Sequence, residues 1–388
     1  MKYNVWNKWD PLEVCMLGNN YTPEFFNGIP DKAGDPLKKI CEETLEDLEV
    51  FKNTLQDFGV EVIQPIMNNN ERFIDNPSRY PRGPLQPRDH FCVLGNELYY
   101  SGEDHSAIEN ELQNYESISQ FGKWNFDYPS PLPKDKYDEI AGSDFPAYEY
   151  FMNHRRNNKY FSETVYKELI DYSAFYTGLS GACCFQLGKR LDMARVTSTG
   201  KQIENFDYNK GEIEQFIPSL KNFDINYIYT EGHTDGNYHP IKPGAILSLH
   251  DVQTYKDTFP GWDVCYLAEE SWHKVSEFRK VKHKNHGKWY LAGEEENDEF
   301  TNFVETWLTD WVGYVEETVF DVNVLMLDEH HCCVSNNKND IVKTFFKKHK
   351  IEPVYIPWRH RYFWDGGLHC ITLELKRKGK QKDYFNEV

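Results

Sequence analysis

The first hundred residues contain short apolar runs, bounded by turn-forming residues, and one long pattern of apolar side chains at helical spacing. Residues 91–94 and 97–100 are separated only by Gly95 and Asn96, which is the chemistry of a tight hairpin turn. The predicted elements are strands at residues 14–18, 60–63, 91–94 and 97–100 and a helix at residues 37–58.

The second half of the chain returns to the same order of elements. The predicted elements there are strands at residues 226–229, 245–248, 354–356 and 370–375, a hairpin formed by 322–326 and 332–334, and helices at 299–315 and 341–348. Hairpin, helix and strand recur with little sequence identity between copies, which predicts an α/β protein of repeated β-β-α-β modules.

Two polar stretches interrupt this rhythm. Residues 66–88 and 101–178 predict long loops, of the kind that often builds the wall of an active site. No stretch of the chain has the composition of a linker between domains. We therefore expect one domain covering residues 1–388.

The charge and the apolar content exclude two classes of partner. The formal net charge is -19, so a nucleic-acid backbone would be repelled. No run approaches the roughly 18 apolar residues that a membrane helix needs, and the N-terminus has no apolar signal region. These features predict a cytoplasmic protein. The acidic surface either attracts a cationic substrate or simply keeps the protein soluble.

Nine cysteines are spread along the chain, and their number is odd. No paired C-x-x-C spacing of a zinc site occurs among them. This pattern is typical of a reducing compartment, in which most of the thiols are small buried core residues.

Two segments have the residue types of a catalytic site. His233 and Asp235 are two apart, so on an extended segment both would point the same way; the alternative is a structural histidine near a turn. Gly366 and Gly367 precede Cys370, and two glycines let a backbone pass close to a ligand. Cys370 would then open a strand at the rim of a cavity; the alternative is a buried core thiol.

Two aspartates complete the set of candidates. Asp89 follows Gln86, Pro87 and Arg88 just before a predicted strand, where it either acts in a site or ends a loop. Asp192 either orients a histidine or lies at the surface. Neither residue carries a functional assignment on its own.

Taken together, these segments resemble the amidinotransferases of the arginine:glycine amidinotransferase type, within the guanidino-modifying (pentein) superfamily. The matching segments are Trp9-Asp10-Pro11-Leu12-Glu13, Pro87-Arg88-Asp89, Gly95-Asn96-Glu97, Asp192, His233-Thr234-Asp235, Pro243-Gly244 and residues 323–329, 366–372 and 376–379. Several motifs in the right order are more specific than any one of them. The resemblance implies a five-bladed α/β propeller of ββαβ modules around a central active site, no metal or other cofactor, and a homodimer.

The resemblance also implies the roles of the residues. Cys370 is expected to be the nucleophile and His233 the general acid and base. Asp192 is expected to orient His233, while Asp89 and Asp235 hold the guanidinium. Physical chemistry agrees, because paired carboxylates can fix a planar guanidinium while a soft thiolate attacks its carbon. The expected reaction moves the amidino group of L-arginine to an acceptor amine, glycine by default, and releases ornithine.

The sequence departs from the family where the donor's carboxylate should bind. Residues 249–253 contain no arginine, and His250 or Lys256 is the expected substitute. Two other activities stay open: a deiminase that uses water as the acceptor, and a protein that only binds guanidino compounds. Product analysis separates these from transfer.

Two further segments have a competing interpretation. Residues 329–333, Glu-His-His-Cys-Cys, are five potential metal ligands in a row, but neighbours on a strand face opposite sides and cannot all meet at one ion. Arg359, His360 and Arg361 are either substrate contacts or a solvated basic loop.

Overall fold

The structure is a computed structural model of the 388-residue chain. It describes residues 3–75, 82–100, 106–113, 181–196, 218–230, 233–249, 254–267, 290–308, 311–312, 321–336, 338–364 and 366–386. Most of the predicted loop at 101–178 lies outside the described residues, and within it Ser106–Gln113 forms a helix.

The elements have the following bounds. The helices are α1 Asp31–Asp57, α2 Pro87–His90, α3 Ser106–Gln113, α8 Tyr255–Thr258, α10 Asp298–Trp307, α11 Asp340–His349 and α12 Arg361–Trp364. The strands are β1 Leu12–Leu17, β2 Glu61–Ile63, β3 Phe91–Leu94, β4 Glu97–Tyr100, β5 Cys184–Leu187, β6 Arg190–Val196, β7 Asp224–Thr230, β8 Tyr238–Lys242, β9 Ala245–Ser248, β10 Asp263–Tyr266, β11 Leu325–Met326, β12 His331–Val334, β13 Glu352–Tyr355 and β14 Thr372–Arg377. Short 3₁₀ turns are η1 Pro23–Phe26, η2 Phe73–Asp75, η6 Gly181–Cys183, η7 Pro218–Asn222 and η8 Thr234–Gly236.

The described strands form five small sheets. In three of them an antiparallel pair is followed by a helix and then by a strand parallel to the second member of the pair, as in β11-β12-α11-β13. The other two are β8-β9-α8-β10 and β14-β1-α1-β2, the latter closed by the last strand of the chain. The predicted ββαβ module is confirmed for these three sheets.

The predicted and the observed elements differ most at their ends. The hairpin β3-β4 is confirmed, with Gly95 at φ 63° in its turn, a conformation that glycine adopts without steric cost. Helix α1 starts before the predicted residue 37 because buried Ala33 and Pro36 already pack in its first turns. Strand β14 starts after Cys370, which therefore lies in the turn before the strand and does not open it.

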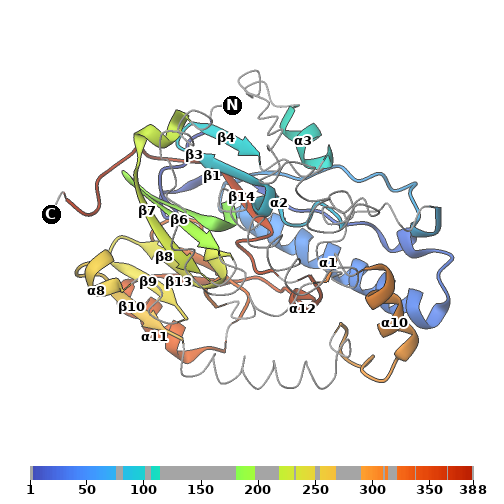
Figure 1. The fold of residues 1–388 in the computed structure, drawn as a ribbon. Helices are drawn as coiled ribbons and strands as arrows, with labels where there is room; N and C mark the ends of the chain where they lie inside the picture. Colours follow the sequence, from blue (N-terminus) through green and yellow to red (C-terminus); the bar gives the residue numbers. More distant parts are fainter. Residues whose placement is uncertain are drawn as a thin grey trace, which may run out of the picture.

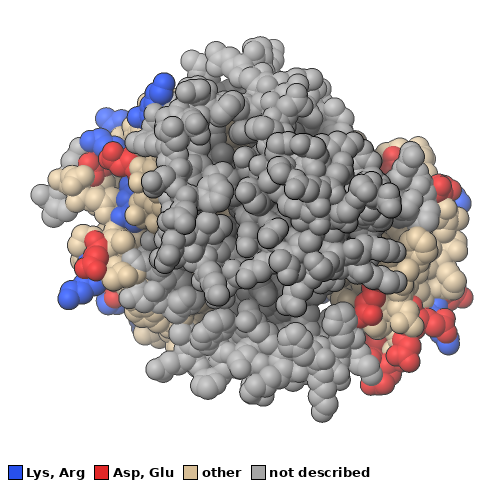
Figure 2. Space-filling view, viewed as in Figure 1, with Lys and Arg blue, Asp and Glu red and all other residues tan. Residues whose placement is uncertain are grey.

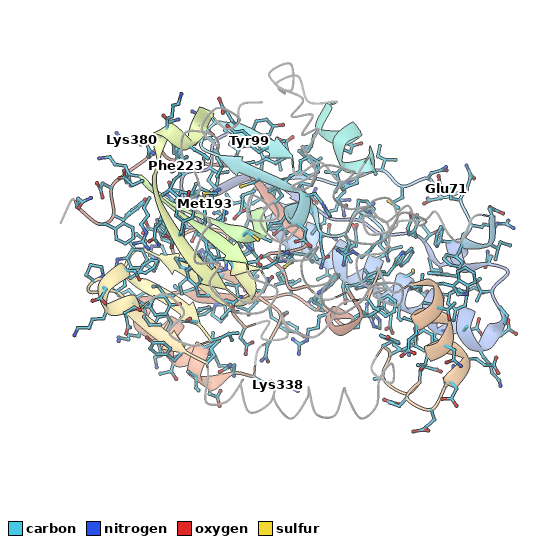
Figure 3. All side chains as sticks on the ribbon, viewed as in Figure 1. Glu71, Tyr99, Met193, Phe223, Lys338 and Lys380 are labelled. Carbon is cyan, nitrogen blue, oxygen red and sulfur yellow. The ribbon has the colours of Figure 1, made fainter. Side chains whose placement is uncertain are left out.

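Strands from opposite ends of the chain form the centre of the molecule. β1 and β14 lie side by side in Figure 1, and β14 provides the strand that follows the Cys370 turn. Residues of different sheets pack through shared apolar clusters. Tyr99, Met193 and Phe223, labelled in Figure 3, belong to one such cluster between β4, β6 and β7. The core thus joins the sheets directly around the segments that carry the candidate residues.

The surface of the described residues shows the acidic character of the sequence. Acidic side chains gather at the right-hand edge in Figure 2, where Figure 1 places α10. Within the described ranges, every helix is either too short or too polar to span a bilayer.

Candidate active site

Cys370 lies in a tightly packed turn between α12 and β14, and its side chain is buried. A Cβ on Gly367 would lie 2.6 Å from Asn323 Oδ1, and a Cβ on Gly366 would overlap the Gln86 amide. Both positions therefore need glycine, because the neighbouring side chains leave no room for a Cβ. Gln86 also donates to the carbonyl of Trp364 at 3.2 Å, so the residues just before Asp89 contact the Cys370 turn directly.

Asn323 and Asp235 both contact the sulfur of Cys370. Asn323 Nδ2 lies 3.0 Å from Sγ, and Asp235 Oδ2 lies 3.5 Å from it. Asp235 is fully buried in η8, and Asn323 is 1% exposed just before β11. The predicted nucleophile and one predicted guanidinium-binding carboxylate are thus brought together, from segments 135 positions apart in the chain.

Asp235 is held by the residue next to Cys370. His369 Nδ1 lies 2.7 Å from Asp235 Oδ2, and both side chains are fully buried. Burial, and then the charge of Arg88, lower the pKa of His369 well below its usual value. The imidazole is therefore neutral at pH 7 and donates its Nδ1–H to the carboxylate, which fixes the direction of the Asp235 side chain.

His233 and Asp89 form a second pair. The two side chains approach to 3.8 Å between Nδ1 and Oδ1, and Arg82 lies 3.8 Å from the other oxygen of Asp89. His233 is about one third exposed while Asp89 is mostly buried, so the pair lies nearer the solvent than Asp235 and Cys370. The expected extended segment is wrong, because His233 directly precedes the 3₁₀ turn η8, and Asp235 lies within that turn.

Asp192 contacts other groups than expected. Its Oδ1 accepts from Arg190 Nε at 2.7 Å and Asn226 Nδ2 at 2.8 Å, and its Oδ2 accepts from the Tyr238 hydroxyl at 2.9 Å. Within the described residues no hydrogen bond or ion pair joins Asp192 to His233, whose nearby carboxylate is Asp89. The structure thus does not bring these two predicted residues together directly.

The contacts of Asp192 predict the effect of Asp192→Asn. The Cζ atom of Arg190 lies 4.4 Å from the ring centroid of Phe259 and 4.5 Å from that of Phe385. These rings hold the guanidinium in place, so it cannot move to another acceptor when its hydrogen bond to residue 192 is weakened. Loss of the charged acceptor should lower the free energy of unfolding by about 1–3 kcal/mol. Urea unfolding measures this loss, and the pH profile of turnover should stay unchanged. Normal stability combined with a displaced pH profile would contradict this structural role and restore Asp192 as the residue that orients His233.

A buried ionic cluster lies beneath the Cys370 turn, and sequence reasoning did not identify it. Glu374 contacts Arg88 and lies 3.6 Å from Lys8 and 3.3 Å from Arg377, with all four side chains at most 3% exposed. Arg88 also donates its Nε–H to the carbonyl of His369 at 2.7 Å, so the cluster supports the backbone beside the predicted nucleophile. The three cations, Arg88 the strongest, hold the pKa of the Glu374 carboxyl well below its usual value despite burial.

Arg359 and His360, which were expected either to contact substrate or to lie in a solvated loop, make structural contacts. Arg359 binds Asp47 on α1 at 2.9 Å, and His360 lies 2.6 Å from Glu43 on the same helix. These contacts tether the segment before α12 to α1.

Cys332 and Cys333 pack into two different apolar clusters, as expected for neighbours on a strand. Within the described residues no group of three potential ligands is positioned for a metal ion.

The structure tests the prediction of buried cysteines but not the prediction that His250 or Lys256 replaces the missing arginine. No disulfide joins any of the nine cysteines, and all nine are buried, which agrees with the prediction of buried thiols. Lys256 is exposed on α8, and His250 lies outside the described residues. The binding of the donor's carboxylate stays a prediction.

The sequence is similar to two named groups of amidinotransferases along almost its whole length. It is 24% identical over 412 residues to the mitochondrial glycine amidinotransferase of Xenopus tropicalis, covering 98% of this chain and 84% of that protein. It is 21% identical over 406 residues to inosamine-phosphate amidinotransferase 1 of Streptomyces glaucescens, covering 98% of both. No family model matches the chain.

Two solved structures share the fold. One is an amidinotransferase from Microseira wollei in the saxitoxin biosynthetic pathway, with TM-score 0.54, 18% identity and 99% of both chains covered. The other is the inosamine-phosphate amidinotransferase of Streptomyces griseus, with TM-score 0.52, 14% identity and coverage of 98% of this chain and 99% of that one. These two likenesses show a shared fold, and the relatives found by sequence are named amidinotransferases, which supports an enzyme of that kind.

Proposed function

We propose that the protein transfers the amidino group of L-arginine to an acceptor amine through an amidino-Cys370 intermediate and releases ornithine. One observation carries the proposal. The sulfur of Cys370 lies 3.5 Å from the buried carboxylate of Asp235, in a site that also contains the His233–Asp89 pair. A carboxylate beside a thiol suits a cationic, planar group whose carbon must lie within reach of sulfur.

The steps assign each residue one task. Asp235 and Asp89 hold the guanidinium, and the Cys370 thiolate attacks its carbon. His233 then gives a proton to the departing nitrogen as the C–N bond breaks, so that ornithine leaves as a neutral amine. In the second half the acceptor amine attacks the amidino carbon, His233 takes its proton, and the C–S bond breaks to regenerate the thiolate.

The position of His233 and Asp235 depends on the strand that follows them. Tyr238 opens β8 directly after the η8 segment, and its hydroxyl is fixed by Asp192. In the proposal Asp192 therefore supports His233 through the backbone of this segment rather than by direct contact. Removing Asp192 would loosen the site without removing a reacting group.

The proposal includes a five-bladed α/β propeller in a single domain of residues 1–388. Five small sheets among the described residues, and the pairing of the last strand with the first, support this arrangement. Isolated bridges from Val5 to Gly95 and from Gly188 to Asp383 join further segments that are distant in the sequence.

The acceptor is proposed as glycine, the acceptor in the name of the Xenopus tropicalis relative, while the Streptomyces glaucescens relative is named for an inosamine phosphate. The alternative activity uses water at the same site and produces citrulline and ammonia. Labelled arginine with glycine, lysine, γ-aminobutyrate, ethanolamine and an aminocyclitol, analysed by mass spectrometry, separates these activities. Ornithine together with an amidinated amine is the expected result. Citrulline and ammonia in place of ornithine would reject transfer.

A further inference from the structure

Asn323 contacts the Cys370 turn at three points, and no role has so far been assigned to it. Its Oδ1 accepts from the backbone N–H of His369 at 2.9 Å and of Cys370 at 3.1 Å. Its Nδ2 lies 3.0 Å from Cys370 Sγ. The side chain is buried just before β11, 47 positions earlier in the chain than the cysteine.

These contacts fix which way the amide faces. Two backbone N–H groups can only donate, so the atom that they both approach is the carbonyl oxygen of the amide. The NH₂ group must therefore face the sulfur, and it also lies 3.4 Å from the carbonyl oxygen of Asp235. An N–H donor is thus held against Cys370 Sγ by the backbone of the nucleophile's own turn.

The electrostatic need for such a donor comes from Asp235. Its carboxylate lies 3.5 Å from the same sulfur, and a nearby negative charge disfavours a thiolate. A hydrogen bond donated to the sulfur favours the charged form and opposes that effect. Because the amide is neutral, it stabilises the thiolate without repelling a cationic guanidinium held by Asp235.

We propose that Asn323 is a catalytic residue that donates its Nδ2–H to the Cys370 thiolate. The inference rests on the proposed function, in which Cys370 is the nucleophile. The hydrogen bond stabilises the thiolate before it attacks the guanidino carbon, and again when the C–S bond breaks and sulfur takes back the electron pair. Asn323 thereby assists both halves of the transfer and holds the turn in which Cys370 lies.

The substitution Asn323→Asp removes the N–H donor and keeps the acceptor. Aspartate keeps Oδ1 as the acceptor for the two backbone N–H groups, but places a negative oxygen where the N–H met the sulfur. We expect the pH profile of Cys370 alkylation by iodoacetamide, followed on the Cys370 peptide by mass spectrometry, to move to higher pH by about one unit or more. Formation of the amidino adduct from arginine should slow by about a hundredfold.

The chain offers a matched control. Asn20 Nδ2 lies 3.7 Å from the sulfur of Cys41 in the apolar core, a second buried asparagine–cysteine contact. Asn20→Asp should leave the alkylation profile of Cys370 unchanged. If Asn323→Asp does not fold, Asn323→Ala removes the donor without adding a charge, and an alkaline displacement of smaller size is expected.

The two proposals fail separately. A folded Asn323 variant whose Cys370 alkylates with the wild-type pH profile would overturn the role of Asn323, whatever the reaction is. Absence of an amidino adduct on wild-type Cys370 would instead overturn the proposed function, while an alkaline displacement in Asn323→Asp would still support the contact with the thiolate.

Discussion

Replacing Cys370 by alanine is expected to reduce amidino transfer by at least about a thousandfold. The alanine variant keeps the turn, because the backbone N–H of residue 370 can still donate to Asn323. What it loses is the sulfur to which, in the proposed mechanism, the amidino group becomes attached. Substrate should still bind, since the carboxylates of Asp89 and Asp235 stay in place. Steady-state kinetics and arginine binding by calorimetry measure the two effects separately.

A buried cysteine outside the site provides the control. Cys265 lies on β10 in a cluster of apolar side chains and is as free of disulfides as Cys370. Cys265→Ala should leave the rate of transfer within about twofold of wild type, because it changes only local packing. Turnover by Cys370→Ala at a similar rate to Cys265→Ala would remove Cys370 from the mechanism.

The substitution Glu374→Gln is expected to have the largest effect on stability. Lys8, Arg88 and Arg377 surround this carboxylate, and all are buried. Removing the negative charge leaves three buried cations without their shared counterion, which costs about 3–5 kcal/mol in the free energy of unfolding. Urea unfolding measures the loss. Activity should fall as well, because Arg88 holds the carbonyl of His369 beside the proposed nucleophile, Cys370.

The matched control lies on the neighbouring strand. Glu13 pairs with Lys376 at 2.8 Å, and both side chains are 37% exposed. Glu13→Gln should cost less than about 1 kcal/mol, since an exposed ion pair contributes little. Equal losses for Glu13→Gln and Glu374→Gln would show that the buried cluster has no special role.

The same cluster predicts a pH dependence. The pKa of Glu374 is lower in the folded protein than its usual value of 4.5, so the folded state favours the charged form. Its contribution to stability is present above pH 4.5 and is lost as the pH falls towards the folded pKa. Glu374→Gln should therefore show a weaker acid dependence of unfolding than wild type.

Local features of the fold could be predicted from the sequence. The hairpin β3-β4 depends on Gly95 and Asn96, and its apolar runs are contiguous, so neighbouring residues suffice to define it. The start of α1 could not be predicted, because Gly34 and Pro36 disfavour a helix by their own preference and are held in its first turns by tertiary packing. The start of β14 depends in the same way on its partner β1, from the other end of the chain.

The candidate site could be predicted as a set of residues but not as a set of contacts. Asp235 reaches Cys370 across the fold, and no pattern of spacing shows which of several aspartates does so. Asp192 was expected beside His233, yet its strand directs it to Arg190 and Tyr238. His369 and Asn323 were within the matching segments, but a neutral buried imidazole or a single amide has no signal of its own in a sequence.

The mass of the Cys370 peptide, after the enzyme has been mixed with arginine and quenched with acid, tests the central claim most directly. The account predicts one added amidino group on Cys370, which disappears when an acceptor amine is supplied and is absent from Cys370→Ala. An unmodified Cys370 peptide under conditions in which ornithine is formed, or an amidino group on another cysteine, would contradict it.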